Sequence, residues 1–363
     1  MDFNSNERMK SNMQYVRDSF SFNEFTNQAK SILQSTVKQE VANAFTPKIA
    51  QQLKVNKTRI IISLSVFLAS FLIGAIVSLI TFNSIAMIVF TAISAIALIV
   101  TTVFLISYRK TANYLSKQIQ RNLNSVEIYN KILQIIDQAF HYHGNSITYA
   151  DNNLDFNSVD INIKEHDWYR PSTVESTAKI IRTSKKSYFD IDNKYPICSQ
   201  NVIWEYVYRT KDREEKKHYY ATLLKIDTSK SKSKNFNFGM FSRNCVNGKK
   251  IKLENNEFNK IMQLYSDNEL EARKMYTPLA MENTVKHYAQ NRKNQASFNL
   301  GIVSHNDTVY ASFLTPDSGF LNIDVPMSSK KEKIESKILK DIIVDVFTYY
   351  YIIAYLFIPL YLD

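Results

Sequence analysis

Residues 60–107 read IIISLSVFLASFLIGAIVSLITF-NS-IAMIVFTAISAIALIVTTVFLIS, and these 48 positions contain no Asp, Glu, Lys, Arg or His. The stretch divides at Asn83-Ser84 into two apolar halves, 60–82 and 85–107, of 23 residues each. At a rise of about 1.5 Å per residue, each half spans roughly 35 Å as a helix, more than the hydrocarbon core of a bilayer. Because a backbone in lipid must satisfy its hydrogen bonds within each helix, we expect a transmembrane helical hairpin. A buried helical pair in a water-soluble core is the alternative, and the long uncharged run argues against it.

Basic residues flank this stretch on both sides without any acidic residue. The segments 41–59 and 108–126 each hold four Lys or Arg and no Asp or Glu. Positively charged flanks stay on the cytoplasmic side of a cell membrane, so we expect both ends of the hairpin and both chain termini in the cytoplasm. The same charges suit anionic lipid headgroups, which makes the lipid bilayer the first expected partner. The membrane-flanking cations nearest the spans are Lys54, Lys57, Arg59, Arg109 and Lys110.

Small residues recur every four positions in the first half of the hairpin, at Ser70, Gly74 and Ser78. This spacing lets two helices approach closely in lipid. These residues are therefore the expected transmembrane packing face, either between the two halves of the hairpin or between copies of the chain in a homo-oligomer. Packing within the chain needs no partner and is the favoured interpretation. A proton or ion path through the span is disfavoured, because the span carries no ionisable side chain.

The segments on either side of the hairpin have helical apolar spacing. Residues 1–23 are a polar tail, 24–59 an amphipathic helix that Pro47 should break, and 108–140 a second amphipathic helix. Two such helices that enter and leave one hairpin run side by side, and each can bury its apolar stripe on the other as a stalk. The expected stripes are Phe25, Ala29, Ile32, Val37, Val41, Phe45, Ile49 and Leu53, and then Leu115, Ile119, Leu123, Val126, Ile132, Leu133, Ile136 and Phe140.

From His141 the period of the pattern changes, and residues 141–363 are predicted to form a cytosolic α+β domain with a mixed or antiparallel sheet. Apolar residues at 159, 161 and 163 alternate with polar ones, as in a half-buried strand. A helix is expected from Glu269 to about Arg292, and His305-Asn306-Asp307 predicts a hairpin turn. Further strands are expected at 202–208, 218–226, 236–241, 250–253, 258–265, 298–303, 308–314 and 321–325.

The C-terminal stretch has two interpretations. Residues 346–362 are uncharged, but Pro359 interrupts these 17 positions, and they are short for a membrane span. Apolar residues at helical spacing from Ile334 to Leu356 favour a C-terminal helix that closes the α+β core. Contact of residues 346–362 with the membrane is the alternative.

Sequence signatures of catalysis and cofactor binding are weak throughout the chain. No glycine-rich dinucleotide or phosphate loop, no HExxH and no GxSxG occurs. His141 and His143 stand two apart, as zinc ligands can, but no third ligand is near them in the sequence. The calcium-loop-like run 151–155 fails, because Phe156 and Asn162 stand where Gly and Glu are needed.

Three further partial patterns have plainer explanations. Asp190 and Asp192 form a lone DxD, which suits a solvated turn better than a magnesium site. Ser304, His305 and Asp307 are too close in the sequence to converge as a catalytic triad. We therefore assign no catalytic, cofactor-binding or metal-binding residue and expect no cofactor. The two cysteines, expected to be reduced thiols, are Cys198 and Cys245.

The charge balance of the chain is basic, with 45 Lys and Arg against 34 Asp and Glu and a net charge of +11. No groove-reading helix or aromatic RNA-binding motif accompanies this charge, so no nucleic acid is expected as a partner. The basic loop that contains Lys230, Lys232 and Lys234 suits solvent or a lipid surface.

Residues 236–325 carry an ordered run of motifs: FNFGMF at 236–241, LENNEF at 253–258, LYSDNELEARKMYTPLAME at 264–282, and the hairpin turn at 305–307. Together with two spans near the N-terminus, this order resembles the bacterial family known as domain of unknown function 3137. Asn237 departs from the family pattern, which tends to have an aromatic residue there. The resemblance implies an α+β domain on a membrane hairpin. It implies no activity, because no catalytic residues are established for the family.

Within these motifs the residues suit structural roles. Ser266, Asp267 and Asn268 suit the N-cap of a helix that begins with acidic residues. Thr277-Pro278 suits a break and restart of that helix. Arg273 is expected to pair with one of three acidic residues, Glu254, Glu257 or Asp267.

Two hypotheses of function follow. The first is a two-span integral membrane protein that presents a cytosolic α+β domain for binding or scaffolding, without catalysis, with a protein partner or a second copy of the chain. The second is a membrane-tethered enzyme that acts on a phosphorylated or lipid substrate. The enzyme would need a cluster of carboxylates, and the candidates for it are Asp151, Asp190 and Asp192.

Overall fold

The computed structural model describes residues 21–81, 84–125, 127–145, 154–211, 213–230, 237–241, 248–291, 299–316 and 319–361. The chain separates into two compact units. One contains residues 33–128 and 323–341 and is mostly helical. The other contains residues 1–32, 129–322 and 342–363 and holds the sheet.

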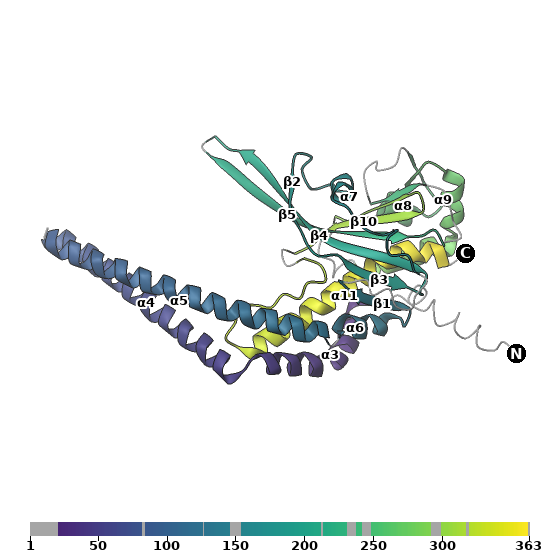
Figure 1. Cartoon of the computed structure of the whole chain (residues 1–363). Helices are drawn as coiled ribbons and strands as arrows, with labels where there is room; N and C mark the ends of the chain where they lie inside the picture. The colour runs from purple at the N-terminus through teal and green to yellow at the C-terminus, as the bar shows by residue number, and fades with distance from the viewer. Residues whose placement is uncertain are drawn as a thin grey trace. The chain divides into compact units, whose positions relative to one another are not determined.

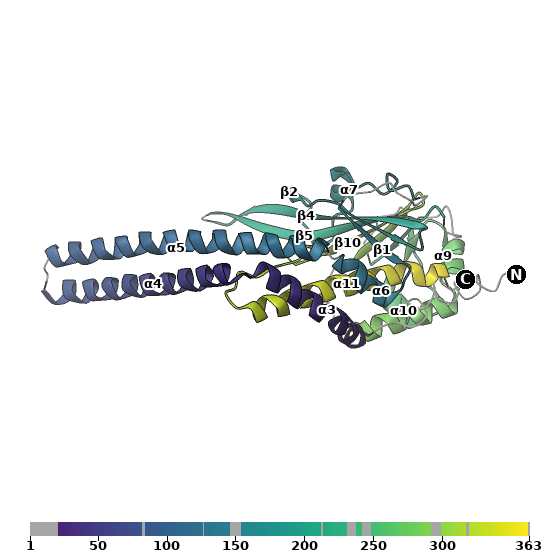
Figure 2. The ribbon, with the colours of Figure 1, turned by 60° about the horizontal axis from the view of Figure 1, so that its bottom comes forward.

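Three long helices begin the described chain: α3 (Phe22–Ala44), α4 (Pro47–Thr81) and α5 (Ser84–Ser125). The break predicted at Pro47 is confirmed, because α3 ends at Ala44 and Pro47 opens α4, where its missing N–H costs no hydrogen bond. Helices α4 and α5 run side by side along their apolar length (Figure 2). Each apolar half therefore continues into its flanking polar segment as one uninterrupted helix.

The stalk predicted on either side of the hairpin forms where α3 meets α5. The side chain of Asn122 donates to the carbonyl of Glu40 at 3.3 Å. Buried stripes run along both helices, with Leu33, Val37 and Val41 on α3, and Leu115, Ile119 and Leu123 on α5. One expected stripe residue is wrong: Ile32 is 46% exposed, and Leu33 takes its place, because strict four-residue spacing from Ala29 continues through position 33.

The sheet is antiparallel throughout its described pairs, as predicted. Its strand order is β1-β3-β4-β5-β10-β9-β6-β8-β7 (Figure 1). Strand β2 lies off this path and pairs with a different part of β4 than β3 does. The predicted hairpin turn is confirmed: Asn306 and Asp307 have φ of +48° and +58°, and His305 pairs with Thr308. The strands are β1 (Phe140–Gly144), β2 (Lys179–Thr183), β3 (Ser187–Ile191), β4 (Tyr195–Arg209), β5 (Glu214–Asp227), β6 (Phe238–Met240), β7 (Lys249–Lys250), β8 (Tyr265–Ser266), β9 (Gly301–His305) and β10 (Thr308–Leu314).

Two predicted strands are not strands, and in both cases an asparagine caps the first turn of a helix that begins there. The expected strand at 159–163 is wrong, because Asn162 caps α7 (Ile163–Trp168) by accepting from the backbone N–H of Lys164 and Glu165. The expected strand at 258–265 is wrong, because Asn255 caps α8 (Asn256–Met262) in the same way. Val159 and Ile161 still face the core, but Ile163 is 58% exposed. Phe258 and Met262 face the core from α8, so apolar spacing alone did not separate strand from helix.

The expected strand at 321–325 is also wrong. Its backbone N–H groups bind carboxylates of α11 (Lys331–Tyr361) in place of a neighbouring strand. Within the sheet unit, Leu321 N–H donates to Asp345 at 2.8 Å. Within the helical unit, Asp324 N–H donates to Asp341 at 2.8 Å. The predicted strand at 250–253 is also largely absent, because β7 ends at Lys250.

The helical stretch expected from Glu269 is split as Thr277-Pro278 predicted, into α9 (Glu269–Met275) and α10 (Pro278–Asn291). Asn268 caps α9 by accepting from the N–H of Glu271. Arg273 pairs with Glu254 at 2.5 Å and with Glu269 at 2.7 Å. The first of these was among the three expected partners, and the second stabilises α9 across one helical turn.

The C-terminal half of α11 packs on one face of the sheet, which confirms the predicted closing helix. Tyr349 stacks on Phe189 of β3 at 4.8 Å, and Phe357 contacts Tyr195 of β4 at 5.2 Å. Helix α11 is long and apolar enough to cross a membrane, but 94% of its most apolar window is buried within the protein. This burial weighs against membrane contact by residues 346–362.

One buried histidine makes this core sensitive to acid. His287 of α10 lies among the rings of Tyr350, Tyr351 and Tyr355 at 4.8–5.5 Å, and its Nε2–H donates to the carbonyl of Tyr351 at 3.2 Å. Burial lowers the pKa of His287 to about 4. Between about pH 6.5 and 4, His287 is protonated in the unfolded chain but neutral in the folded chain. The free energy of unfolding therefore falls as the pH falls through that window.

We predict that His287→Phe weakens this pH dependence. At pH 7.5 the variant should lose about 1 kcal/mol, because one hydrogen bond is removed. Between pH 6.5 and 4 it should avoid up to about 3 kcal/mol of the wild-type loss. Chemical denaturation of the full chain in detergent at a series of pH values measures both effects. If the free energy of unfolding depended on pH equally in the wild type and the variant, His287 would not be the source of the acid sensitivity. The remaining slope should include His166, whose pKa burial also lowers to about 4, together with the other shifted groups.

Candidate functional site

Helices α4 and α5 are joined by a row of polar contacts inside an otherwise apolar pair. Asn56 donates to Ser107 at 3.0 Å, the hydroxyls of Ser63 and Thr101 lie 2.8 Å apart, and those of Ser70 and Ser94 lie 2.7 Å apart. Positions 56, 63 and 70 are seven residues apart, the repeat of a left-handed coiled coil. Because lipid offers no hydrogen-bonding partner, these groups satisfy one another across the pair.

Of the three small residues predicted to pack in the membrane, two contact α5 in the described structure. Ser70 faces α5 through its contact with Ser94. At Gly74, an added Cβ would lie 2.7 Å from the Cβ of Phe90, so only glycine fits at this distance. The side chain of Ser78 is outside the described residues. Where it is described, this face is occupied by α5, which favours packing within the chain over its use between copies.

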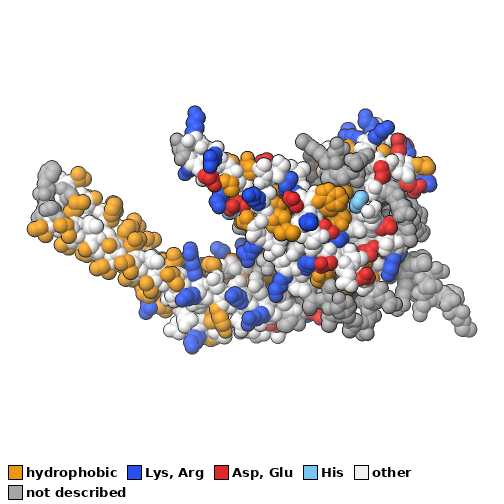
Figure 3. Space-filling view, turned by 45° about the horizontal axis from the view of Figure 1, so that its top comes forward, with side chains coloured by type: hydrophobic (Ala, Val, Ile, Leu, Met, Phe, Trp, Pro, Cys, Tyr) orange, Lys and Arg blue, Asp and Glu red, His pale blue; other side chains and the backbone are white. Residues whose placement is uncertain are grey.

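The membrane-flanking cations gather at one level of the hairpin. Lys54, Lys57 and Arg59 on α4 and Arg109 and Lys110 on α5 are all exposed. The hydrogen bond between Asn56 and Ser107 holds the two basic segments beside each other. Arg59 also lies over the ring of Phe104, with 5.2 Å from its guanidinium carbon to the ring centre. Basic side chains in Figure 3 accordingly collect where the apolar surface of the hairpin ends.

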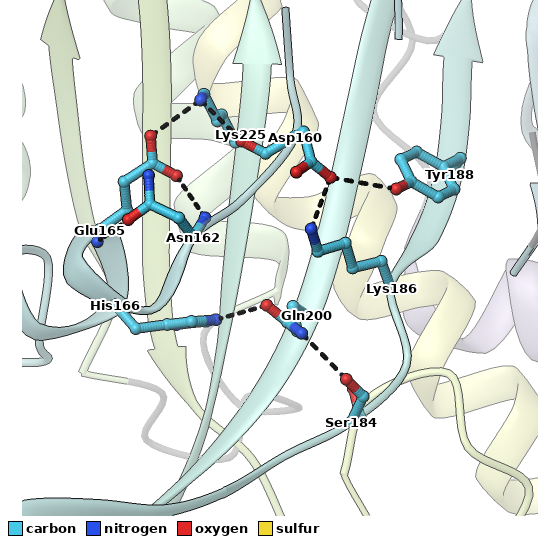
Figure 4. A network of polar contacts seen from close by, with 9 residues as sticks. All are labelled: Asp160, Asn162, Glu165, His166, Ser184, Lys186, Tyr188, Gln200 and Lys225. Carbon is cyan, nitrogen blue, oxygen red and sulfur yellow. Dashed lines mark hydrogen bonds and ion pairs between the residues drawn. The ribbon is translucent and has the colours of Figure 1, made fainter. Parts of the chain in front are cut away.

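The second candidate region is a charged network on the face of the sheet opposite α11 (Figure 4). Its centre is Lys225 of β5, whose side chain is only 11% exposed. The ammonium of Lys225 contacts Glu165 of α7 at 2.8 Å and the carbonyl of Asp160 at 2.9 Å. Glu165 accepts in turn from the hydroxyl of Tyr310 at 3.3 Å and from the N–H of Asn162 at 3.0 Å. One carboxylate thus caps α7 and fixes it to the sheet.

Two further contacts hold the segment that contains α7 on this face. Asp160 binds Lys186 at 2.5 Å and the hydroxyl of Tyr188 at 3.3 Å. His166 lies 3.2 Å from the amide oxygen of Gln200, and burial keeps the imidazole neutral by lowering its pKa to about 4. The sequence carried two signals of this network: the capping pattern Asn162-x-x-Glu165, and a lysine inside the apolar run 219–226.

The two histidines with zinc-like spacing meet a carboxylate. Asp190 is fully buried, and its two oxygens bind His141 Nδ1 at 3.1 Å and His143 Nε2 at 2.6 Å. Burial alone would raise the pKa of Asp190, but the hydrogen bonds from His141 and His143 outweigh burial and hold it below its usual value. The hydrogen bond to Asp190 raises the pKa of His141. The cluster therefore clamps β1 to β3, and the DxD prediction of a solvated turn is wrong for Asp190.

The remaining candidates for chemistry are not gathered around these histidines. Asp151 and Cys245 lie outside the described residues. Burial raises the pKa of the Cys198 thiol to about 12, so it is not a reactive nucleophile. Ser304, His305 and Asp307 belong to the β9–β10 turn, as expected. Among the described residues, no group of three or more His, Cys, Asp or Glu side chains is arranged to hold a metal ion.

Comparison with known proteins finds a family match for part of the chain. Residues 213–354 match the family described as protein of unknown function (DUF3137). The family predicted from the ordered motifs is thereby confirmed for this part of the chain. The match runs from β5 to the C-terminal half of α11, so it covers Lys225 and Tyr310 but not Glu165 or Asp190. No curated protein and no solved structure matches the chain.

We predict that Gly74→Ala separates α4 from α5. The new Cβ would meet the Cβ of Phe90, which cannot swing away, and overpacking of this kind costs about 1–3 kcal/mol. Phe90→Ala should fail to rescue the variant because alanine keeps that Cβ, whereas Phe90→Gly should rescue it. Unfolding of the three variants in detergent would measure the effect. Equal rescue by alanine and glycine would contradict this packing.

We predict that removing one charge of the Lys225–Glu165 pair lowers the free energy of unfolding strongly, whereas replacing both charged residues lowers it little. Glu165→Gln preserves the cap of α7 but leaves the buried ammonium without its counter-charge, which should cost about 3 kcal/mol. Adding Lys225→Met should recover most of that loss. Chemical denaturation of the single and double variants completes the cycle. If adding Lys225→Met lowered the free energy of unfolding further, this prediction would be contradicted and the charge pair itself would be stabilising.

Proposed function

We propose that this chain is a two-span protein of the cell membrane, with both termini in the cytoplasm and an α+β domain there that binds a partner. The surface of α4 and α5 carries this proposal. Among the described residues, 22 of the 32 exposed large apolar side chains lie between Ile61 and Ile106. Helices 47–77 and 87–124 are each long and apolar enough to span a membrane. Water-soluble proteins rarely expose apolar patches on this scale.

The orientation rests on charge. The cations of α4 and α5 lie at one level and carry no acidic neighbour in the sequence, as cytoplasmic flanks do. These side chains would lie among anionic headgroups, where each cation contributes about 1 kcal/mol to surface attraction. Within the described residues after α5, the third helix apolar enough to span is buried, so the sheet unit would lie on the same side as the cations.

A binding or scaffold role is supported by how the charged groups of the sheet unit are used. Both oxygens of Asp190 and both oxygens of Glu165 are committed to contacts that join strands or fix α7. Trp168, Leu270 and Leu279 are more than half exposed and would be available to a protein partner. A protein partner or a second copy of the chain is therefore proposed over a substrate.

The alternative of a membrane-tethered enzyme has one supporting observation. His141 and His143 are part-exposed imidazoles, each bonded to a buried carboxylate, as general bases often are. Of the three acids that this hypothesis needs, Asp190 is already shared by both histidines, and Asp151 is not described. A substrate analogue that perturbs both imidazole NMR signals would favour the enzyme over the scaffold.

The topology is tested by cysteine accessibility in intact cells. The native thiols are first removed as Cys198→Ala and Cys245→Ser, since Cys198 is buried and would not report. Thr177→Cys, exposed in the sheet unit, should resist an impermeant maleimide until the membrane is permeabilised. Ser84→Cys, where α5 begins, should be labelled from outside. Both should react after denaturation.

Two results would overturn this proposal. Labelling of position 177 without permeabilisation would reverse the orientation. Release of the chain by a carbonate wash without detergent would remove the membrane anchor altogether. A chain that stays in the membrane pellet and labels as expected supports both the anchor and the cytoplasmic domain.

A further inference from the structure

An open cavity of about 100 Å³ lies on the sheet face that carries α7. Its floor includes Gly301 of β9 and Ser312 of β10, which face each other in register. Tyr169 and Tyr310 line it as a stacked pair with ring centres 4.0 Å apart. Because Gly301 has no side chain, the strand pair is hollow at this point.

Among the described residues, Arg170 is the one charged side chain that lines this cavity, and no carboxylate of the described chain lines it. The side chain of Arg170 is 21% exposed. Its Nη1 donates to the carbonyl of Ser176 at 3.1 Å and, weakly, to Asp167 at 3.4 Å. Within the described chain, Nε and Nη2 of Arg170 have no partner. Three N–H groups of this guanidinium therefore have no partner among the described residues.

A second donor lines the same cavity. Ser312 is 9% exposed, and its hydroxyl has no partner among the described residues. Two donors without a partner in the described chain thus line one cavity, where a ligand that accepts hydrogen bonds can reach both. Phe241 and the tyrosine pair supply apolar walls beside these donors.

We propose that this cavity binds a small organic carboxylate. The Nε and Nη2 edge of an arginine matches the two oxygens of a carboxylate in a planar, bidentate pair. The hydroxyl of Ser312 would donate to one of these oxygens, and the apolar walls would flank the short carbon chain. An apolar cavity of roughly 150 Å³ admits benzene in the best-known engineered case. The cavity here is smaller, about 100 Å³, but it is open, so a short carboxylate need not be enclosed whole.

Butyrate, a short carboxylate, is the probe, and butyramide is its neutral match. Isothermal titration of the full chain in detergent should show butyrate binding and no butyramide binding. Arg170→Gln should weaken butyrate at least tenfold, the factor expected for one charged bidentate contact. Ser312→Val should also weaken it, through the lost donor and the added methyl group. Arg182→Gln, at an exposed arginine of β2, is the matched control and should bind as the wild type does.

Unfolding midpoints without ligand separate loss of binding from loss of fold. If Arg170→Gln does not fold, Arg170→Lys keeps the charge without the fork and should still weaken butyrate. Equal binding of butyramide, or unchanged binding by the arginine variants, would overturn the proposal. Tighter binding of inorganic phosphate than of butyrate would also overturn it, because it would indicate an anion site without an apolar wall.

Discussion

The hairpin meets the constraint that a membrane span would impose: its polar groups are bonded within the protein. The backbone meets it by remaining helical from Pro47 to Thr81 and from Ser84 to Ser125. The side chains meet it in pairs across the two helices, as at Ser70 and Ser94. Apolar side chains have no comparable demand and cover the outside. The polar seam therefore fixes which face of each helix points inward, a choice that hydrophobicity alone leaves open.

In the sheet unit, asparagine side chains form the hydrogen bonds that some backbone groups lack from neighbouring strands. Three asparagine side chains each bind the N–H and the carbonyl of a single backbone residue, as a neighbouring strand would. Asn130 serves Tyr142 on β1, Asn201 serves Phe320, and Asn259 serves Leu253. At Asn201 the fit is close, because a Cβ on Gly319, which has φ of +82°, would lie 3.0 Å from its amide nitrogen. Asn130 also shields backbone groups of β1, which ends the sheet.

What the sequence predicted well was local or compositional. An uncharged run predicts a hairpin by length alone, and Pro47 and Asn306-Asp307 predict a break and a turn through their own backbone preferences. The errors at 159–163 and 258–265 arose where an asparagine cap competed with apolar spacing that suited a strand. The cap won, because it satisfies N–H groups that no neighbouring strand reaches. His141 and Asp190 are far apart in the sequence and meet only through the register of β1 and β3, which no local pattern contains. Arg170 and Ser312 line one cavity only because the chain after α7 lies over β10.

The charged network and the cavity share one segment of chain. Asp160 and Glu165 fix this segment to the sheet through Lys225, and a few residues later Tyr169 and Arg170 line the cavity. Tyr310 belongs to both, since its hydroxyl donates to Glu165 while its ring lines the cavity. A ligand held by Arg170 would therefore bind only the attached form of the segment. By linkage it would stabilise that attachment, and loosening of the Lys225–Glu165 pair would weaken the ligand in the same proportion.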